Sequence, residues 1–92
     1  MLSYEWDPNK AESNHAKHGV RFSAATAVFA DDGAITIADD DPREERHMII
    51  GHDGAGRLLV VVFTWRGDEL VRLISARKAT RTEAQFYYLS GP

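Results

Sequence analysis

Residues 58–65 read LLVVVFTW, and this stretch determines the fold that the rest of the sequence builds around. All of its residues except Thr64 are apolar. A β-strand points successive side chains to opposite faces. A strand whose odd and even positions are both apolar is therefore expected to be covered on both faces. The stretch therefore predicts a central strand from Leu58 to Trp65.

Three more strands are predicted from short apolar or alternating runs bounded by turn residues, and they are 34–38, 46–52 and 69–77. Residues 53–56, Asp-Gly-Ala-Gly, predict a hairpin ahead of the central strand, and Gly67-Asp68 predicts a tight turn after it. Tight turns between consecutive strands imply antiparallel pairing. The sequence therefore predicts a four-stranded antiparallel sheet.

Three helices are predicted from their start and stop signals, over residues 8–18, 24–30 and 81–89. Asp7-Pro8 suits the start of the first helix, and Gly19 suits the left-handed residue that ends it. Ser23 is the predicted cap of the second, and Thr80 with Glu83 has capping-box spacing for the third. Two N-terminal helices, the sheet and a C-terminal helix make an α+β fold, with room for a very short strand at 4–6.

Length and composition bound the class of protein. A chain of 92 residues, 43% of them hydrophobic, predicts one globular domain over residues 1–92. The absence of cysteine excludes disulfides, thiolate zinc sites and a cysteine nucleophile. No apolar run approaches the ~20 residues of a membrane helix, and the N-terminus lacks the basic and apolar regions of a secretory signal. We therefore expect a cytoplasmic protein that makes no membrane contact.

The net charge of −3 is unevenly distributed along the chain. Residues 1–56 contain 5 Lys and Arg against 11 Asp and Glu, a balance of −6. Residues 57–92 contain 6 against 3, a balance of +3. An uneven field can bind a polyanion on one face even when the total charge is negative.

Five of the six basic residues of the C-terminal half lie on or beside one predicted strand: Arg66, Arg72, Arg77, Lys78 and Arg81. Strict alternation along residues 69–77 would put Arg77 on the face of Val71 and Leu73, and Arg72 on the other face. An arginine on a face otherwise fit for burial needs a carboxylate partner or a ligand, and its fork matches phosphate geometry. From these residues alone, a salt-bridged strand and a phosphate site are equally supported.

Histidines and aspartates give weaker signals of a metal site. His15 and His18 share a helix face, but no third ligand is evident, and a histidine just before Gly19 suits the helix end. His47 and His52 are separated by an odd number of residues on one strand and so point to opposite faces. The run at 39–41, Asp-Asp-Asp, favours a solvated turn over a magnesium site.

Several motifs along nearly the whole chain resemble, in the same order, those of the BrnT toxin family. They are Tyr4-Glu5-Trp6-Asp7-Pro8-Asn9-Lys10-Ala11, Asn14, Lys17-His18-Gly19-Val20, Phe22, Glu45-Arg46, Gly51, residues 59–64, Arg66-Gly67, residues 74–80, Glu83 and Tyr87. The segment 75–80, Ser-Ala-Arg-Lys-Ala-Thr, is the most specific part. The resemblance implies a RelE-like fold and a type II toxin–antitoxin ribonuclease that uses no metal or other cofactor. It also implies a BrnA-like ribbon-helix-helix antitoxin, a heterotetramer with it, and contact with operator DNA only through that antitoxin.

Metal-free RNA cleavage needs proton transfer and stabilisation of a charged phosphorane-like state. We expect Arg66 and Arg77 to hold the phosphate and Lys78 to assist, which makes these three the predicted catalytic residues. The secondary candidates are Tyr87, His52 and Arg46, and the predicted RNA contacts are Arg72 and Arg81.

Two other functions remain open at this level. The chain could be a non-catalytic toxin-like module that acts with its antitoxin in transcriptional autorepression. It could also be a metal-dependent hydrolase that uses His15 and His18.

Overall fold

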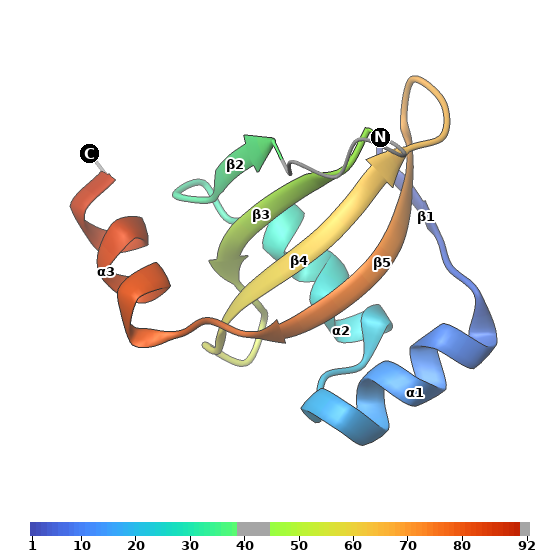
Figure 1. Ribbon diagram of the computed structural model, residues 1–92. Helices are drawn as coiled ribbons and strands as arrows, with labels where there is room; N and C mark the ends of the chain where they lie inside the picture. Colours follow the sequence, from blue (N-terminus) through green and yellow to red (C-terminus); the bar gives the residue numbers. More distant parts are fainter. Residues whose placement is uncertain (39–44, 91–92) are drawn as a thin grey trace.

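The computed structural model describes residues 1–38 and 45–90, and these form one sheet with helices on both of its faces (Figure 1). The elements are β1 (Ser3–Glu5), α1 (Pro8–His18), α2 (Phe22–Ala25), the 3-10 helix η1 (Thr26–Ala30), β2 (Ile35–Ala38), β3 (His47–His52), β4 (Leu58–Trp65), β5 (Leu70–Lys78) and α3 (Arg81–Ser90). None of the described helices is long and apolar enough to span a membrane.

The sheet has five strands in the order β1-β5-β4-β3-β2, so β4 lies at its centre as predicted. Strands β2 to β5 form the expected antiparallel meander. The prediction of four antiparallel strands is wrong in one respect, because β1 adds a fifth strand that runs parallel to β5. The chain between β1 and β5 carries two helices and the rest of the sheet before it returns, and three residues are too few to give an alternation signal.

The first and last helices begin where their capping residues predict. The carboxylate of Asp7 accepts a hydrogen bond of 2.8 Å from the amide of Asn9, and Gly19 ends α1 with a φ of 70°. At α3, the amide of Thr80 donates to Glu83 at 2.8 Å, and the amide of Glu83 donates back to the Thr80 hydroxyl at 3.2 Å. Both helices therefore start at local hydrogen bonds that the spacing of the capping residues predicts.

The second helix differs from its prediction. It starts at Phe22 instead of Ala24, has no side-chain cap, and tightens into η1 at Thr26. Ser23 lies inside α2 and its carbonyl accepts from the Thr26 hydroxyl at 2.9 Å. Phe22 and Val28 are both buried, so packing of these two side chains, rather than a capping residue, sets the bounds of this segment.

The main core lies between the sheet and the segment that contains α1, α2 and η1. Val20, Phe22, Ala25 and Val28 pack there against β3, β4 and β5. On the other face, Tyr87 of α3 packs on Ile50 and Val60. We call this second side the open face, because α3 is the only described helix on it and lies over one end of the sheet (Figure 1).

A β-bulge in β5 decides which of its side chains reach the open face. Val62 pairs with Ser75 but Phe63 pairs with Leu73, which leaves Ile74 as an extra residue. The bulge shifts the alternation, so that Val71, Leu73 and Ala76 all belong to the main core. Cross-strand partners share a face, so Arg72, Ser75 and Arg77 lie on the open face with their β4 partners Thr64, Val62 and Val60. The predicted placement of Arg77 beside Val71 and Leu73 is therefore wrong.

Candidate functional site

Arg77 lies near the end of β5 on the open face and is held by the first turn of α3. Its Nη1 and Nη2 atoms donate to the two carboxylate oxygens of Glu83, at 2.7 and 2.8 Å. These hydrogen bonds lower the pKa of Glu83 to about 2 and raise the pKa of Arg77 above its usual value. Glu83 thus caps α3 and also fixes the guanidinium, a second role that the capping-box spacing does not reveal.

The guanidinium of Arg77 keeps some of its hydrogen-bonding capacity. It has five N–H groups, of which two bond Glu83 and a third bonds the carbonyl of Lys78 at 3.3 Å. No described residue accepts from the Nε–H or from the second Nη2 hydrogen, and 37% of the side chain is exposed. Two parallel N–H groups are the arrangement that binds two oxygens of a phosphate.

His52, at the end of β3, faces α3 on the same side of the sheet. Its Nδ1 lies 3.2 Å from the hydroxyl of Tyr87, which itself donates to Asp31 at 2.7 Å. Because the Tyr87 proton is used on Asp31, Nδ1 of His52 carries the hydrogen that bonds Tyr87. Nε2 then has the lone pair, and it accepts at 3.0 Å from the hydroxyl of the exposed Tyr88. The network therefore places a basic nitrogen at the protein surface.

Asp31 anchors this network from the loop after η1. Besides Tyr87, it accepts hydrogen bonds from the amides of His52 at 2.7 Å and Gly33 at 2.9 Å. Burial alone would raise the pKa of Asp31, but these hydrogen bonds outweigh it and lower the pKa. The carboxylate in turn raises the pKa of Tyr87 to about 12. Tyr87 is only 8% exposed, so its hydroxyl orients His52 and is not offered to solvent.

Two glycines leave room for these contacts. A Cβ at Gly33 would lie 2.8 Å from the Tyr87 hydroxyl oxygen. A Cβ at Gly51 would lie 3.3 Å from Oδ2 of Asp31 and 3.2 Å from the carbonyl oxygen of Val28.

Sequence reasoning missed Asp31 and Tyr88 as site residues. Asp31 directly follows the helix predicted over residues 24–30, and its contact with Tyr87 spans 56 residues, which no local pattern signals.

The predicted catalytic residues do not all come together. Lys78 pairs with Leu59 of the main core, so it starts from the face opposite Arg77, although it is exposed at the strand end. Arg66 lies in the β4–β5 connection, where its amide donates to Leu70. Seven residues of strand separate Leu70 from Arg77, roughly 20 Å. Arg77 is thus near His52 and Tyr87, and Arg66 is at the far end of the sheet.

The remaining predicted residues divide in the same way. Arg72 bonds Glu5 of β1 at 2.6 Å, a cross-strand ion pair that ties β1 to β5. Arg46 precedes β3, at the end of the sheet where Thr64 pairs with Arg72. Arg81 is exposed at the start of α3, near Arg77 along the chain. For Arg72 and Arg77, the salt-bridged interpretation that the sequence left open is thus observed.

The histidines that the alternative metal-dependent function would use, His15 and His18, do not line the same hollow. His18 lines a hollow between α1 and β5, whereas His15 lines another hollow with Trp6 and Arg21. Over residues 1–38 and 45–90, no group of three or more His, Asp or Glu side chains is placed to hold a metal ion. The predicted turn at 39–41 lies outside the described residues.

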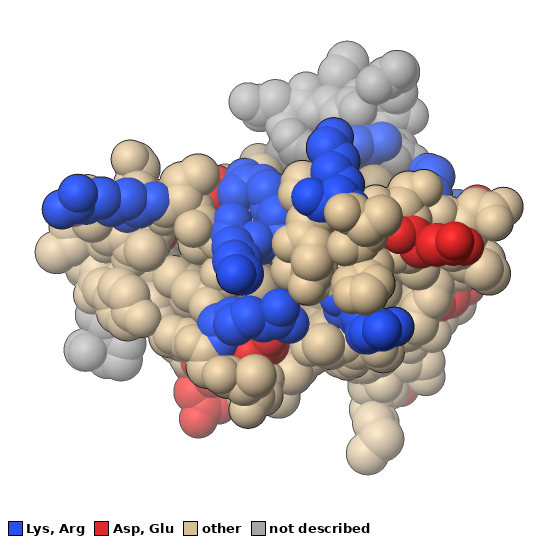
Figure 2. Space-filling view, turned by 90° about the horizontal axis from the view of Figure 1, so that it is seen from below, with Lys and Arg blue, Asp and Glu red and all other residues tan. Residues whose placement is uncertain are grey.

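The surface charge of the fold is as uneven as the sequence predicts. Figure 2 shows the side that carries α1 and the lower end of the sheet, where Lys and Arg side chains gather across the middle and Asp and Glu show mainly toward the margins. The described structure is thus a small α+β domain with a half-open sheet that presents an arginine, a surface histidine nitrogen and a basic side.

Comparison with known proteins places this domain in a family. The family described as "Ribonuclease toxin, BrnT, of type II toxin-antitoxin system" matches residues 6–83. The chain belongs to this family, which confirms the resemblance seen in its motifs. Among solved structures, it is similar to the Brucella abortus ribonuclease toxin BrnT, with 26% identity and a TM-score of 0.71. The similarity covers 88% of this chain and 100% of that one. No curated protein matches the sequence significantly.

Proposed function

We propose that this protein is a metal-independent endoribonuclease toxin of the cytoplasm that cleaves RNA to arrest translation and growth. The observation that carries the proposal is the pair formed by Arg77 and His52 on the open face, one at each end of α3. They lie on β5 and β3, with one strand between them and an offset of two residues, which is roughly 12 Å between backbones. Side chains of this length can reach one phosphodiester from both sides.

The proposed reaction uses the ribose 2′-hydroxyl as the nucleophile. In the substrate complex, the hydroxyl of the exposed Tyr88 gives way to the ribose 2′-hydroxyl at Nε2 of His52. Nε2 takes the proton of the 2′-hydroxyl, whose oxygen bonds the adjacent phosphorus, and the bond from phosphorus to the 5′-oxygen breaks. The 5′-oxygen takes a proton from solvent water as it leaves, and the His52 imidazolium returns its proton to solvent. The products are a 2′,3′-cyclic phosphate and a 5′-hydroxyl. The free Nε–H and Nη2–H of Arg77 bind the non-bridging oxygens, where negative charge accumulates in the transition state. Lys78 adds positive charge from the exposed end of β5.

Glu83 and Asp31 have supporting roles in this scheme. Glu83 holds the guanidinium in one orientation, and Asp31 acts through Tyr87 to fix the ring of His52. Arg81, Arg72, Arg46 and Arg66 remain predicted RNA contacts or auxiliary groups. Of these four, Arg81 is nearest to Arg77 along the chain, so we expect it to contribute most.

The test is cleavage of a single-stranded RNA oligonucleotide by the purified protein in excess EDTA. We expect cleavage with a 2′,3′-cyclic phosphate end, and none when the scissile ribose is 2′-deoxy. Arg77→Ala and His52→Ala should each slow the reaction by about 10²-fold or more. Circular dichroism would confirm that each variant folds. Cleavage that requires a divalent metal, or equal rates in a folded Arg77→Ala variant, would contradict the proposal.

The partner we propose is a BrnA-like ribbon-helix-helix antitoxin, because the family consists of type II toxin–antitoxin ribonucleases. We infer a heterotetramer that reaches operator DNA only through the antitoxin. Co-expression with the product of a neighbouring short gene, followed by light scattering and an operator-binding assay, would test both statements. A toxin that binds the operator alone would contradict the second.

A second candidate function is a non-catalytic module that acts with its antitoxin in autorepression. The ion pairs of Arg77 and Arg72 favour it, since they explain both arginines without RNA. The same EDTA assay separates the two functions. A folded protein that cleaves no RNA but completes a repressing complex would support the second.

A further inference from the structure

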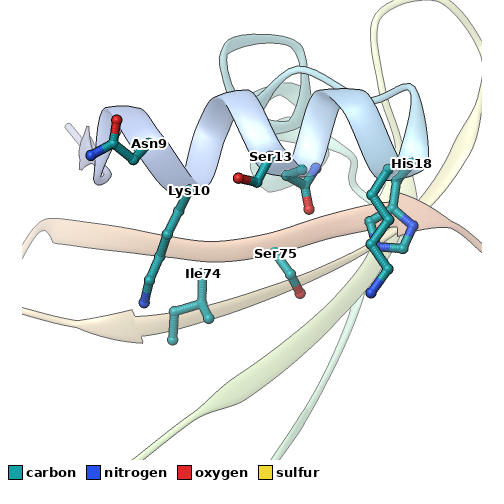
Figure 3. A pocket seen from close by; sticks show the side chains of 8 residues that line it. Asn9, Lys10, Ser13, His18, Ile74 and Ser75 are labelled. Atoms are coloured by element: carbon teal, nitrogen blue, oxygen red, sulfur yellow. The ribbon is translucent and has the colours of Figure 1, made fainter.

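A hollow of about 330 Å³ lies between α1 and the outer edge of β5. Figure 3 shows the side chain of Lys10 reaching down from α1 past β5, toward the side on which Ile74 and Ser75 project, and the ring of His18 at the level of β5. Lys17 also lines the hollow. The cations of α1 therefore extend over the strand edge toward the open face, which carries Arg77.

The hollow lies where, among residues 1–38 and 45–90, no strand pairs with the outer edge of β5. β1 pairs with β5 only from Leu70 to Arg72. Further along, the side chain of Asn14 satisfies the edge, since it accepts from the amide of Ala76 at 3.0 Å and donates to its carbonyl at 2.8 Å. Asn14 is buried, so it fixes α1 at a set distance from the strand. The lysines on either side of it are held over the edge by the fold.

The lining of this hollow suits a polyanion. Lys10 and Lys17 are seven residues apart and so share a helix face, and both are exposed. Within the described part of the chain, neither has a carboxylate partner, and no acidic residue lines the hollow. Ser13 and Ser75 add hydroxyl donors. Ile74 is the one apolar residue in the lining, which argues against a protein segment that docks through apolar side chains.

The hollow lies beside β5, the strand that also carries Arg77 of the proposed cleavage site. Ser75 lies two residues before Arg77 and shares the open face with it. A polyanion strand, such as single-stranded RNA, that occupies the hollow would pass from the α1 lysines along β5 to the guanidinium of Arg77. The same side of the molecule carries the gathering of Lys and Arg seen in Figure 2.

We propose that the α1–β5 hollow binds the phosphate backbone of the RNA substrate, next to the phosphate held by Arg77. The identity of the ligand as RNA rests on the proposed function. Lys10 and Lys17 each neutralise one phosphate, and the two serines donate hydrogen bonds to backbone oxygens. The contacts are to the backbone alone and supply affinity and register, not base preference.

The experiment measures binding of a fluorescent 2′-O-methyl RNA, which lacks the attacking hydroxyl and stays intact whatever the enzyme does. For single strands, each phosphate contact contributes about 0.7 to the slope of log K against log salt, or about fivefold in affinity at 0.1 M. Lys10→Gln and Lys17→Gln should each weaken binding by about that factor and reduce the slope by about 0.7. The matched control is Arg21→Gln, which removes the same charge from the other hollow beside α1.

We expect the control to change affinity by less than about twofold, since a distant charge acts only through a screened field. With cleavable RNA, both lysine variants should need about fivefold more RNA than the wild type to reach half-saturation. Wild-type affinity in both lysine variants would overturn the inference, as would an equal loss in Arg21→Gln. Weaker antitoxin binding with unchanged RNA binding would also overturn it, in favour of a protein interface.

The two proposals fail separately. If Arg77→Ala cleaves normally while the lysine variants bind weakly, the cleavage site is wrong and the hollow is right. If the lysine variants bind normally while Arg77→Ala is inactive, only the hollow is wrong.

Discussion

The hydroxyl of Tyr87 is where α3, the loop after η1 and the end of β3 meet. It donates to Asp31, lies 3.2 Å from Nδ1 of His52, and occupies the space where Gly33 has no Cβ. Loss of the hydroxyl would therefore change three contacts, while the ring would still pack on Ile50 and Val60. At the residue scale, this atom links the stability of α3 to the orientation of the proposed base.

Gly33→Ala should destabilise the protein in a way that depends on this hydroxyl. The new Cβ would lie 2.8 Å from the Tyr87 oxygen, but its next contact on that ring is 3.4 Å, an ordinary separation. We expect Gly33→Ala to cost about 1–3 kcal/mol as overpacking, and Tyr87→Phe about 1 kcal/mol for one buried hydrogen bond. In the double variant, Gly33→Ala with Tyr87→Phe, the alanine should cost little stability, because the hydroxyl oxygen that its Cβ would contact is absent. Urea unfolding of the four proteins measures the coupling, and strict additivity would contradict the geometry.

The ion pair of Glu83 gives a pH-dependent prediction. The carboxylate has a pKa of about 2 in the folded protein against 4.5 for an ordinary glutamate. A lowered folded pKa means that its stabilisation is present above pH 4.5 and is lost as pH falls toward 2. Because the Arg77 side chain is 37% exposed, we discount the shift for solvent screening and expect about 1–2 kcal/mol.

Glu83→Gln is the variant that tests this. It should be less stable than the wild type by about that amount above pH 5, and the difference should shrink between pH 4.5 and 2. Thermal unfolding across this range measures it. Thr82→Gln, at the exposed neighbouring position, controls for substitution in the first turn of α3. A difference that does not vary with pH would mean that the pair with Arg77 contributes nothing.

The local hydrogen bonds of single residues could be predicted from the sequence, and the long-range ones could not. Asp7, Gly19 and the Thr80–Glu83 box act within a few residues, so spacing reveals them. The bond of Glu83 to Arg77 also spans only six residues, yet it depends on how α3 folds back over β5. Asp31 and Tyr88 gain their roles only from tertiary contact, so the sequence alone gave no reason to select them.

At the scale of the elements, Asn14 does for β5 what a strand partner would do. Its side chain bonds the amide and carbonyl of Ala76 and the carbonyl of Val20, and it is 7% exposed. In the sequence, Asn14 is one more polar residue in a polar helix, so nothing there indicates that its side chain is buried against the edge of β5. No sequence pattern predicts the bulge at Ile74 either, yet this bulge places Arg77 on the face that α3 covers.

Substitutions at Asn14 should show that α1 is attached through this edge. Asn14→Ala leaves buried backbone groups of Ala76 unpaired and should cost about 2–4 kcal/mol. Asn14→Asp can still accept from the amide but faces two carbonyl oxygens. Its folded pKa should be raised, so stability should fall as pH rises through neutrality. Denaturant unfolding at pH 5 and 8 measures both, with Ser13→Ala as the exposed control. An aspartate variant more stable at pH 8 would contradict this account.

For the whole molecule, the charge asymmetry of the chain becomes an asymmetry of faces only after folding. The −6 and +3 halves suggested a basic C-terminal surface. In the structure, two of the cations that line the hollow beside β5 come from the acidic half, on α1. Three arginines of the basic half, Arg57, Arg72 and Arg77, are partly neutralised by Asp53, Glu5 and Glu83. Counting charge along the sequence thus predicted that a basic face exists, but not which residues form it.

This arrangement predicts a weak salt dependence for RNA binding by the wild-type protein. If Lys10, Lys17, Arg77, Lys78 and Arg81 carry the phosphate contacts, the slope of log K against log salt should be about −3.5 for a single strand. Engagement of all 11 Lys and Arg would give about −8.

The acidic residues elsewhere repel the rest of the RNA, so binding should cover a short site and not grow tighter with longer oligonucleotides. Titrations of 6-mer and 20-mer RNA from 50 to 300 mM salt measure both quantities. A slope steeper than −5, or affinity that climbs with length beyond the statistical gain in sites, would mean that RNA spreads over a wider surface than the open face and the α1–β5 hollow.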